Sequence, residues 1–165
     1  LEDMHHTISV LVVNQSGVLS RISGLFSGRG FNIESLNVAE TNDSGISRMT
    51  IVTRGDDKKI EQVTKQLNKL VDVIKVIDLT EENFVDRELI LVKMNAEARV
   101  REEILRIVDI FRAKVIDVNP DTYTVEITGD EGKTKGFLDL LKPLGIKEVV
   151  RSGRIAISRG IKPIN

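Results

Sequence analysis

The feature that most constrains the fold of this chain is an order of strand and helix patterns that occurs twice. In the first half, alternating or β-branched apolar segments are typical of strands, and apolar residues at helical spacing are typical of helices. These segments cover, in order, residues 7–13, 18–29, 31–36, 46–53, 60–71 and 73–79. The first half therefore predicts the order βαββαβ.

The same order begins again after a mostly polar segment, residues 80–87, which interrupts the periodic pattern. The second set of patterns covers residues 89–94, 100–111, 115–118, 123–127, 137–144 and 146–157, the last interrupted near Gly153. We therefore expect an α+β protein of two ferredoxin-like domains, residues 5–80 and 88–160, joined by a linker at 81–87. Each domain would be an antiparallel sheet with two helices on one face.

A split βαββαβ order leaves one sheet face without helices, and that face is expected to be partly apolar here. Strand alternation places Leu11, Val13, Leu36 and Val38 opposite the residues that point toward the helices. A domain of about 80 residues also has a marginal core. Both points favour association, and we expect a homodimer.

Composition excludes several classes of function. The chain has no cysteine, which rules out disulfides and thiolate chemistry, and no metal-ligand set is assigned. No apolar run reaches the ~18–20 residues that span a bilayer, and the N-terminus lacks a secretory pattern, so we expect a cytoplasmic protein without a membrane partner. A formal net charge of -1 gives no general attraction to nucleic acid.

Two loops carry the residue types expected of a small-molecule site. Residues 14–17 separate a strand from a helix, residues 28–32 lead into the next strand, and we expect both loops at the same edge of the sheet. The free backbone N–H groups at the helix start and Gly17 would accept a carboxylate, while the amide oxygen of Asn14 or Asn32 would accept from an ammonium group. The side chains expected to enclose an aliphatic group are Val18, Leu19 and Ile33. Asn, Ser and Gly also precede helices that bind no ligand, so the residues alone leave both interpretations open.

These loops belong to longer motifs. The motifs cover Asn14–Arg21, Gly24–Phe26, Arg29–Leu36, Ser47–Ile51, Lys65–Val73, Arg87–Lys93, Ile116–Val118 and Arg151–Gly153. In these motifs the chain resembles the small regulatory subunits of acetolactate synthase, whose N-terminal domain is an ACT domain. The resemblance covers nearly the whole chain, including both predicted domains.

The resemblance implies a regulatory function. The first domain would bind a branched-chain amino acid, typically valine, at an interface between two small subunits. The family's effector contacts map to Asn14, Gly17 and Asn32, to which we add Val18 and Ile33 as neighbouring positions. The chain itself would be non-catalytic. It would activate the catalytic large subunit and make it sensitive to feedback inhibition in branched-chain amino acid biosynthesis. Thiamine diphosphate, Mg and FAD are expected in that large subunit, with no cofactor in this chain.

The second repeat is not expected to duplicate the effector site. It has Asn95–Ala98 where the first repeat has Asn14–Gly17, so the glycine is missing. A residue with a β-carbon at that position restricts approach to the backbone. A structural or activating role is expected for the second domain.

Three alternatives remain open. The chain could be another amino-acid sensor built on ACT domains, or an RNA-binding βαββαβ module, although aromatic residues make up only 4% of the sequence. An independent enzyme would have only His5 and His6 as imidazole bases, and we expect these to belong to a disordered end or a tag-like remnant.

Overall fold

The computed structural model describes residues 4–160, which form two repeats of one topology. The first repeat consists of β1 (Met4–Val13), α1 (Val18–Gly28), β2 (Ile33–Glu40), β3 (Ile46–Gly55), α2 (Asp57–Asn68) and β4 (Val73–Asp78). The second consists of β5 (Phe84–Asn95), α3 (Ala98–Ile110), β6 (Lys114–Val118), β7 (Thr122–Gly129), α4 (Glu131–Gly145) and β8 (Ile146–Arg151), and is followed by β9 (Ile155–Ser158).

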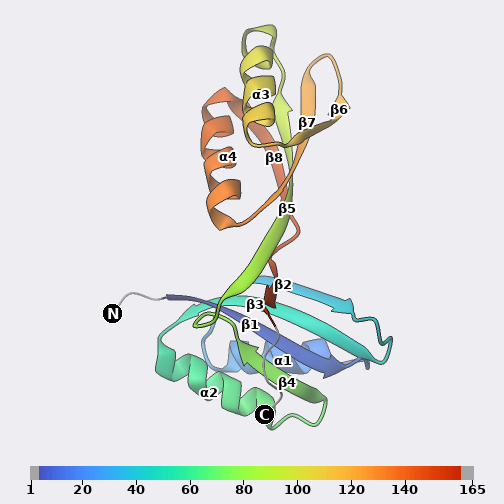
Figure 1. The fold of residues 1–165 in the computed structure, drawn as a ribbon, viewed down its shortest axis with the longest axis vertical. Coiled ribbons are helices and arrows are strands. Elements are labelled where there is room, and N and C mark those ends of the chain that lie inside the picture. Colours follow the sequence, from blue (N-terminus) through green and yellow to red (C-terminus); the bar gives the residue numbers. More distant parts are fainter. Residues whose placement is uncertain (1–3, 161–165) are drawn as a thin grey trace. The chain divides into compact units, whose positions relative to one another are not determined.

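Each repeat forms its own antiparallel sheet, and the two sheets have the same topology. The strand order is β2-β3-β1-β4 in the first and β6-β7-β5-β8 in the second, so equivalent strands occupy equivalent places. The second sheet has a fifth strand, β9, which pairs with β5. In each sheet the two helices of the repeat cover one face (Figure 1). The predicted fold class, two ferredoxin-like βαββαβ domains, is confirmed.

Each repeat has its own core between the helices and the sheet. The fully buried side chains of the first include Ile8, Phe26 and Ile51, and those of the second include Ile90 and Phe137. Phe26 packs edge to face against Phe31, and Phe137 packs in the same way against Phe111, with ring centroids 6.2 and 5.5 Å apart. Four of the five phenylalanines in the sequence therefore serve core packing.

A β-bulge in β2 changes which of its side chains face the helices. Ile33 pairs with Thr53, but Ser35 pairs with Val52, so one extra residue, Glu34, shifts the register. Leu36 consequently pairs with the core residue Ile51 and packs against the first core. The prediction that Leu36 and Val38 face away from the helices is wrong, because a shift of one residue moves every later side chain to the opposite face.

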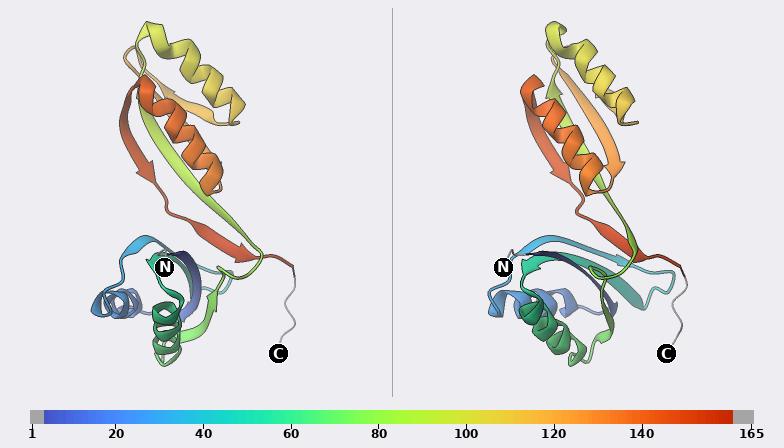
Figure 2. Two further views of the ribbon diagram at one scale, coloured as in Figure 1. Left: turned by 90° about the vertical axis from the view of Figure 1, so that its left-hand side faces the viewer. Right: turned by 60° about the vertical axis from the view of Figure 1, so that its left-hand side comes forward.

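The other face of the first sheet is not bare, because the C-terminal strand covers part of it. Ser9 and Thr50 point away from the helices and are nonetheless buried. β9 contacts β1 and lies on the side of the sheet opposite α1 and α2 (Figure 2). Two hydrogen bonds hold the chain just before β9, from Arg154 N–H to Ser35 Oγ at 3.4 Å and from Asn37 Nδ2 to the Arg154 carbonyl at 3.3 Å.

The two compact units therefore differ in extent from the expected domains. Residues 4–85 and 154–160 form one unit, and residues 86–153 form the other. Strand β5 begins at Phe84, inside the segment expected to be a linker, and residues 154–160 lie with the first unit. The single strand expected over 146–157 is two strands, β8 and β9, which both pair with β5, and β9 also contacts β1 of the first sheet.

An ion pair with one buried member, Glu88, joins β5 to β8 and gives a testable effect on stability. Glu88 is 6% exposed, and its carboxylate accepts a hydrogen bond from Arg151 Nε. Arg151→Leu would leave that carboxylate buried without a cation, so we expect the free energy of unfolding to fall by about 1–3 kcal/mol. Urea unfolding followed by circular dichroism measures the change.

Lys93→Leu is the matched control for this prediction. It removes a pair between the same two strands, Lys93 with Glu148 at 2.9 Å, in which both side chains are exposed. Such pairs contribute little, and we expect a loss below about 1 kcal/mol. Equal losses in the two variants would contradict the role given to the burial of Glu88.

Candidate effector site

The first predicted loop begins with Asn14, which lies directly after β1. Its backbone N–H donates to the Gly45 carbonyl at 2.8 Å. Its side-chain Nδ2 donates to Glu40 Oε1 and to the Ser44 carbonyl, both at 3.0 Å. Because both side-chain contacts use the amide nitrogen, the amide oxygen of Asn14 is the atom available to accept a hydrogen bond from a ligand.

Gly17 forms the start of α1 in a conformation that favours glycine. Its φ is +86°, and its carbonyl accepts the first intrahelical hydrogen bond, from Arg21 N–H at 3.0 Å. Within the described part of the chain, no side chain caps α1, and its first turn holds no acidic residue. In contrast, Asp56 caps α2 by accepting from Lys59 N–H at 2.8 Å. The N–H groups of the first turn of α1 are thus open to an external acceptor.

The apolar residues beside this turn are not equally available. The Val18 side chain is 3% exposed and packs in the core, so it cannot enclose a ligand, contrary to the expectation for its side chain. Its backbone N–H remains part of the open turn. Leu19 is 44% exposed and is the apolar side chain of this turn that a ligand could contact.

The second predicted loop ends at Asn32 and Ile33, where β2 begins. Asn32 is exposed, and its carbonyl accepts a hydrogen bond from Thr53 Oγ1 at 2.7 Å. Ile33 is half-buried and packs against the first core. This anchoring positions the side chain of Asn32 at the edge strand of the sheet.

Within one chain the two loops lie at opposite ends of the sheet. Asn14 follows Val13, which pairs with Ile46 at the beginning of β3, whereas Ile33 pairs with Thr53 near its end. Seven residues of strand separate these positions, which corresponds to roughly 20 Å. The prediction that both loops share one sheet edge is wrong, because β1 and β2 both pair antiparallel with β3 and so run parallel to each other.

Two further residues adjoin Gly17 and are not predicted to belong to the site, although both lie within the sequence motifs. A Cβ placed on Gly17 would lie 3.4 Å from Arg21 Nη1, so the guanidinium lies over the turn. Arg21 pairs with Asp72, whose carbonyl accepts from Val13 N–H at 2.8 Å. The spacing of four residues between Gly17 and Arg21 is a helical signal that could have indicated this position. The contact with Asp72, 51 residues away along the chain, has no such signal.

In the equivalent loop of the second unit, side chains of the loop and of α3 bond to one another at the helix start. Glu97 precedes α3, and its carboxylate accepts from Arg99 Nε at 2.9 Å and from Asn95 Nδ2 at 3.3 Å. The Arg99 guanidinium lowers the pKa of the Glu97 carboxyl below its ordinary value, so an anion already stands at this helix start. The absence of an effector site here stays a prediction, and this arrangement favours it.

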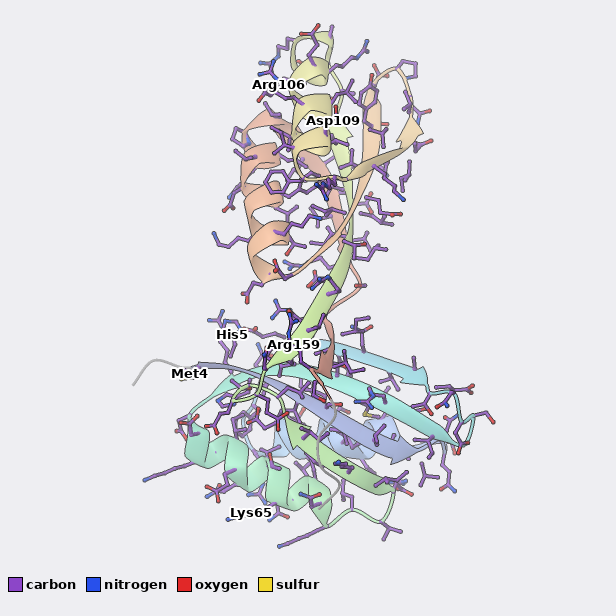
Figure 3. All side chains as sticks on the ribbon, in the orientation of Figure 1. Met4, His5, Lys65, Arg106, Asp109 and Arg159 are labelled. Carbon is purple, nitrogen blue, oxygen red and sulfur yellow. The ribbon has the colours of Figure 1, made fainter. Side chains whose placement is uncertain are left out.

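A separate open cavity of about 510 Å³ lies along the second half of α2, next to Arg29, which follows α1. Its lining residues are Arg29, Gln62, Lys65, Gln66, Asn68 and Lys69. Lys65, labelled in Figure 3, pairs with Glu61 at 2.8 Å and lowers the pKa of that carboxyl. Basic side chains at helix carboxyl ends stabilise the helices themselves, so these cations need no ligand to explain them.

The two histidines are part of β1 and not of a disordered end. His6 is 3% exposed, with Nδ1 3.2 Å from Asp78 Oδ2 and Nε2 3.4 Å from Asp57 Oδ1. His5 Nδ1 lies 3.0 Å from Glu34 Oε2. The expectation of a tag-like remnant is therefore wrong. Among residues 4–160, no group of three or more His, Cys, Asp or Glu side chains is placed to hold a metal ion.

None of the helices between residues 4 and 160 is long and apolar enough to cross a membrane.

Family models match both halves of the chain. The model described as an "AHAS small subunit-like ACT domain" matches residues 8–75, and the model described as "Small subunit of acetolactate synthase" matches residues 87–160. Together they cover most of both repeats.

Individual relatives are similar over nearly the full length. An acetolactate synthase small subunit from Aquifex aeolicus is 56% identical over 155 residues, which cover 93% of this chain and 81% of the relative. A probable acetolactate synthase small subunit from Archaeoglobus fulgidus is 53% identical, with 96% and 99% covered. The crystal structure of the small subunit from Thermotoga maritima has a TM-score of 0.86 at 41% identity, with 96% and 99% covered.

Proposed function

The chain belongs to the acetolactate synthase small-subunit family, and from this premise we propose that it is a non-catalytic regulatory subunit acting on a separate catalytic subunit. It raises the activity of that subunit and makes it sensitive to a branched-chain amino acid, most simply valine. Thiamine diphosphate, Mg and FAD are held by the catalytic subunit, and no residue of this chain is assigned to them. The setting is the cytoplasmic synthesis of branched-chain amino acids.

The observation that carries this proposal is the open first turn of α1 beside Asn14. The backbone N–H groups that follow Gly17 would bind the carboxylate of a free amino acid. The amide oxygen of Asn14 would accept from its ammonium group, because Nδ2 of Asn14 is already held by Glu40 and Ser44. Both charged ends of a zwitterion then have a partner, and Leu19 offers apolar contact to its side chain.

Asn32 would reach the same ligand only from a second copy of the chain. β2 is an edge strand, so two copies can pair through it in antiparallel orientation about a twofold axis. That pairing places the beginning of β2 of one copy beside the end of β2 of the other, where Glu40 contacts Asn14. The homodimer proposed here thus has two equivalent sites, each with Asn14 and Gly17 of one chain and Asn32 and Ile33 of the other.

Regulation follows if the dimer has two arrangements and the ligand binds one of them with higher affinity than the other. A ligand that bridges two chains stabilises the arrangement in which both halves of its site are correctly spaced, and it shifts the population toward that state. In this proposal that state supports less catalysis. Valine, leucine and isoleucine differ by about one methylene, worth ~1–3 kcal/mol, so the preference among them is expected to be modest.

An assay with the purified catalytic subunit tests the regulatory role. Addition of this chain is expected to raise turnover of pyruvate severalfold, and a valine titration is expected to reverse most of that gain. Asn14→Ala should keep the activation and lose the response to valine, since it removes the ammonium acceptor together with only two exposed hydrogen bonds, to Glu40 and Ser44. Turnover that is unaffected by the wild-type chain would overturn the proposal, and turnover by the chain alone would show that it is an enzyme.

A further inference from the structure

The guanidinium of Arg21 lies against the turn that is proposed to receive the effector carboxylate. Arg21 is one helical turn after Gly17, to which its backbone N–H is bonded at 3.0 Å. Its Nη1 is 3.4 Å from the position of a Cβ on Gly17, and its side chain is about half exposed. A cation therefore stands within reach of any anion bound at this turn.

Arg21 already has an anionic partner, Asp72, in the turn between α2 and β4. The contact joins Arg21 Nη2 to Asp72 Oδ2, so Nη1 is directed toward Gly17 while Nη2 holds the carboxylate. The Asp72 backbone is fixed independently, because its carbonyl accepts from Val13 N–H at 2.8 Å. Solvent reaches both members of this pair, since the side chain of Arg21 is 51% exposed and that of Asp72 is 19% exposed. Such a pair contributes little net free energy, and the guanidinium can change partner at small cost.

We propose that Arg21 is shared between Asp72 and the effector, whose carboxylate competes with Asp72 for the guanidinium. This inference rests on the proposed function and adds a residue and a counter-charge to the same site. Asp72 is the resting anion at this position, and the effector carboxylate takes over part of its interaction. The site therefore prefers ligands with a free carboxylate over ligands whose carboxyl group is blocked.

The exchange of partners by Arg21 is also expected to affect the turn between α2 and β4, outside the site. Asp72 follows Val71, which is 97% exposed at the tip of the turn between α2 and β4. Release of the Asp72 carboxylate removes the contact of this turn with the Arg21 side chain of α1 and leaves its backbone bond to β1 in place. Occupancy of the site is thereby communicated to an apolar residue at the surface.

Calorimetric titration of the full chain with valine tests the competition. Asp72→Asn removes the competing charge and the repulsion of the ligand carboxylate, so valine should bind about fivefold more tightly. Arg21→Gln should weaken valine about tenfold, and Arg21→Lys should recover part of that loss because it restores the cation. Asp109→Asn, on α3 in the second unit (Figure 3), removes the same charge elsewhere and should leave the affinity unchanged.

Valinamide, in which the carboxylate is blocked, separates a role in binding from a structural role. Asp72→Asn should gain nothing for valinamide, whereas an equal gain for both ligands would overturn the competition. Unchanged or weaker valine binding by Asp72→Asn would overturn it as well, and would leave the proposed function standing if the wild-type chain binds valine. Failure of the wild-type chain to bind valine would overturn both.

Discussion

Gly17→Asp is expected to abolish valine binding while the fold remains intact. The new carboxylate would lie beside the open N–H groups of α1 and beside Arg21, whose Nη1 is 3.4 Å from the Cβ position. It would therefore occupy the place of the effector carboxylate and repel it. We expect the dissociation constant for valine to rise on the order of 100-fold, equivalent to about 2.7 kcal/mol.

The same substitution should affect stability only slightly. A Cβ on Gly17 meets no described atom closer than 3.4 Å, and aspartate is one of the residues that tolerate a positive φ. The remaining strain is about 1 kcal/mol, which shifts the melting temperature of a chain this size by about 4 °C. Calorimetry with valine and thermal unfolding followed by circular dichroism measure the two effects separately.

Gly132→Asp is the matched control. Gly132 lies in the first turn of α4, where Asp130 and Glu131 already supply negative charge, and the nearest described atom to a Cβ there is Asp130 Oδ1 at 3.7 Å. This variant makes the same chemical change at another helix start and should bind valine as the wild-type chain does. Valine affinity within threefold of wild type in Gly17→Asp would mean that the effector carboxylate is bound elsewhere.

Complementation between two inactive variants is expected to restore half of the effector sites. Asn14→Ala and Asn32→Ala should each lose valine binding as homodimers, because every site then lacks one of the two amides. In a heterodimer of the two variants, one site contains both alanines and the other contains both asparagines. Differently tagged chains, co-expressed and purified through both tags, should bind one valine per heterodimer with wild-type affinity.

The reverse combination distinguishes a two-chain site from a site within one chain. A chain carrying both substitutions, paired with a wild-type chain, has one alanine in every site if the sites are shared, and should bind no valine tightly. If Asn14 and Asn32 of the same chain formed the site, this pair would bind one valine and the first pair none. That result would contradict the separation of roughly 20 Å between the two loops within one sheet.

Much of the fold could be predicted because it depends on local patterns. Strand alternation and helical spacing reveal both βαββαβ repeats, and the equivalent strand orders of the two sheets agree with them. The bulge at Glu34 could not be predicted, since an extra residue in one strand is visible only against its partner. Strand alternation alone therefore places Leu36 and Val38 on the wrong face. The burial of His6 has no local signal either, because its partners, Asp57 and Asp78, are distant in sequence.

The residues of the candidate site also fall into two groups, those recognisable from local pattern and those that depend on tertiary contacts. A strand, a glycine and a helix start are consecutive in sequence, so Asn14 and Gly17 are recognisable from local pattern. The positions of Asn32 and Asp72 relative to that turn depend on strand direction and on a contact between α1 and the turn that follows α2. Neither can be deduced from spacing along the chain.

The sequence by itself determined the repeated order of elements and the family, because backbone propensities, side-chain periodicity and motif residues are local properties. Only the tertiary structure decided that the two asparagine loops lie at opposite ends of a sheet, that β9 covers the first sheet, and that Arg21 is held by Asp72. Strand direction, register and long-range ion pairs arise when distant segments pack together, and each depends on the whole set of contacts.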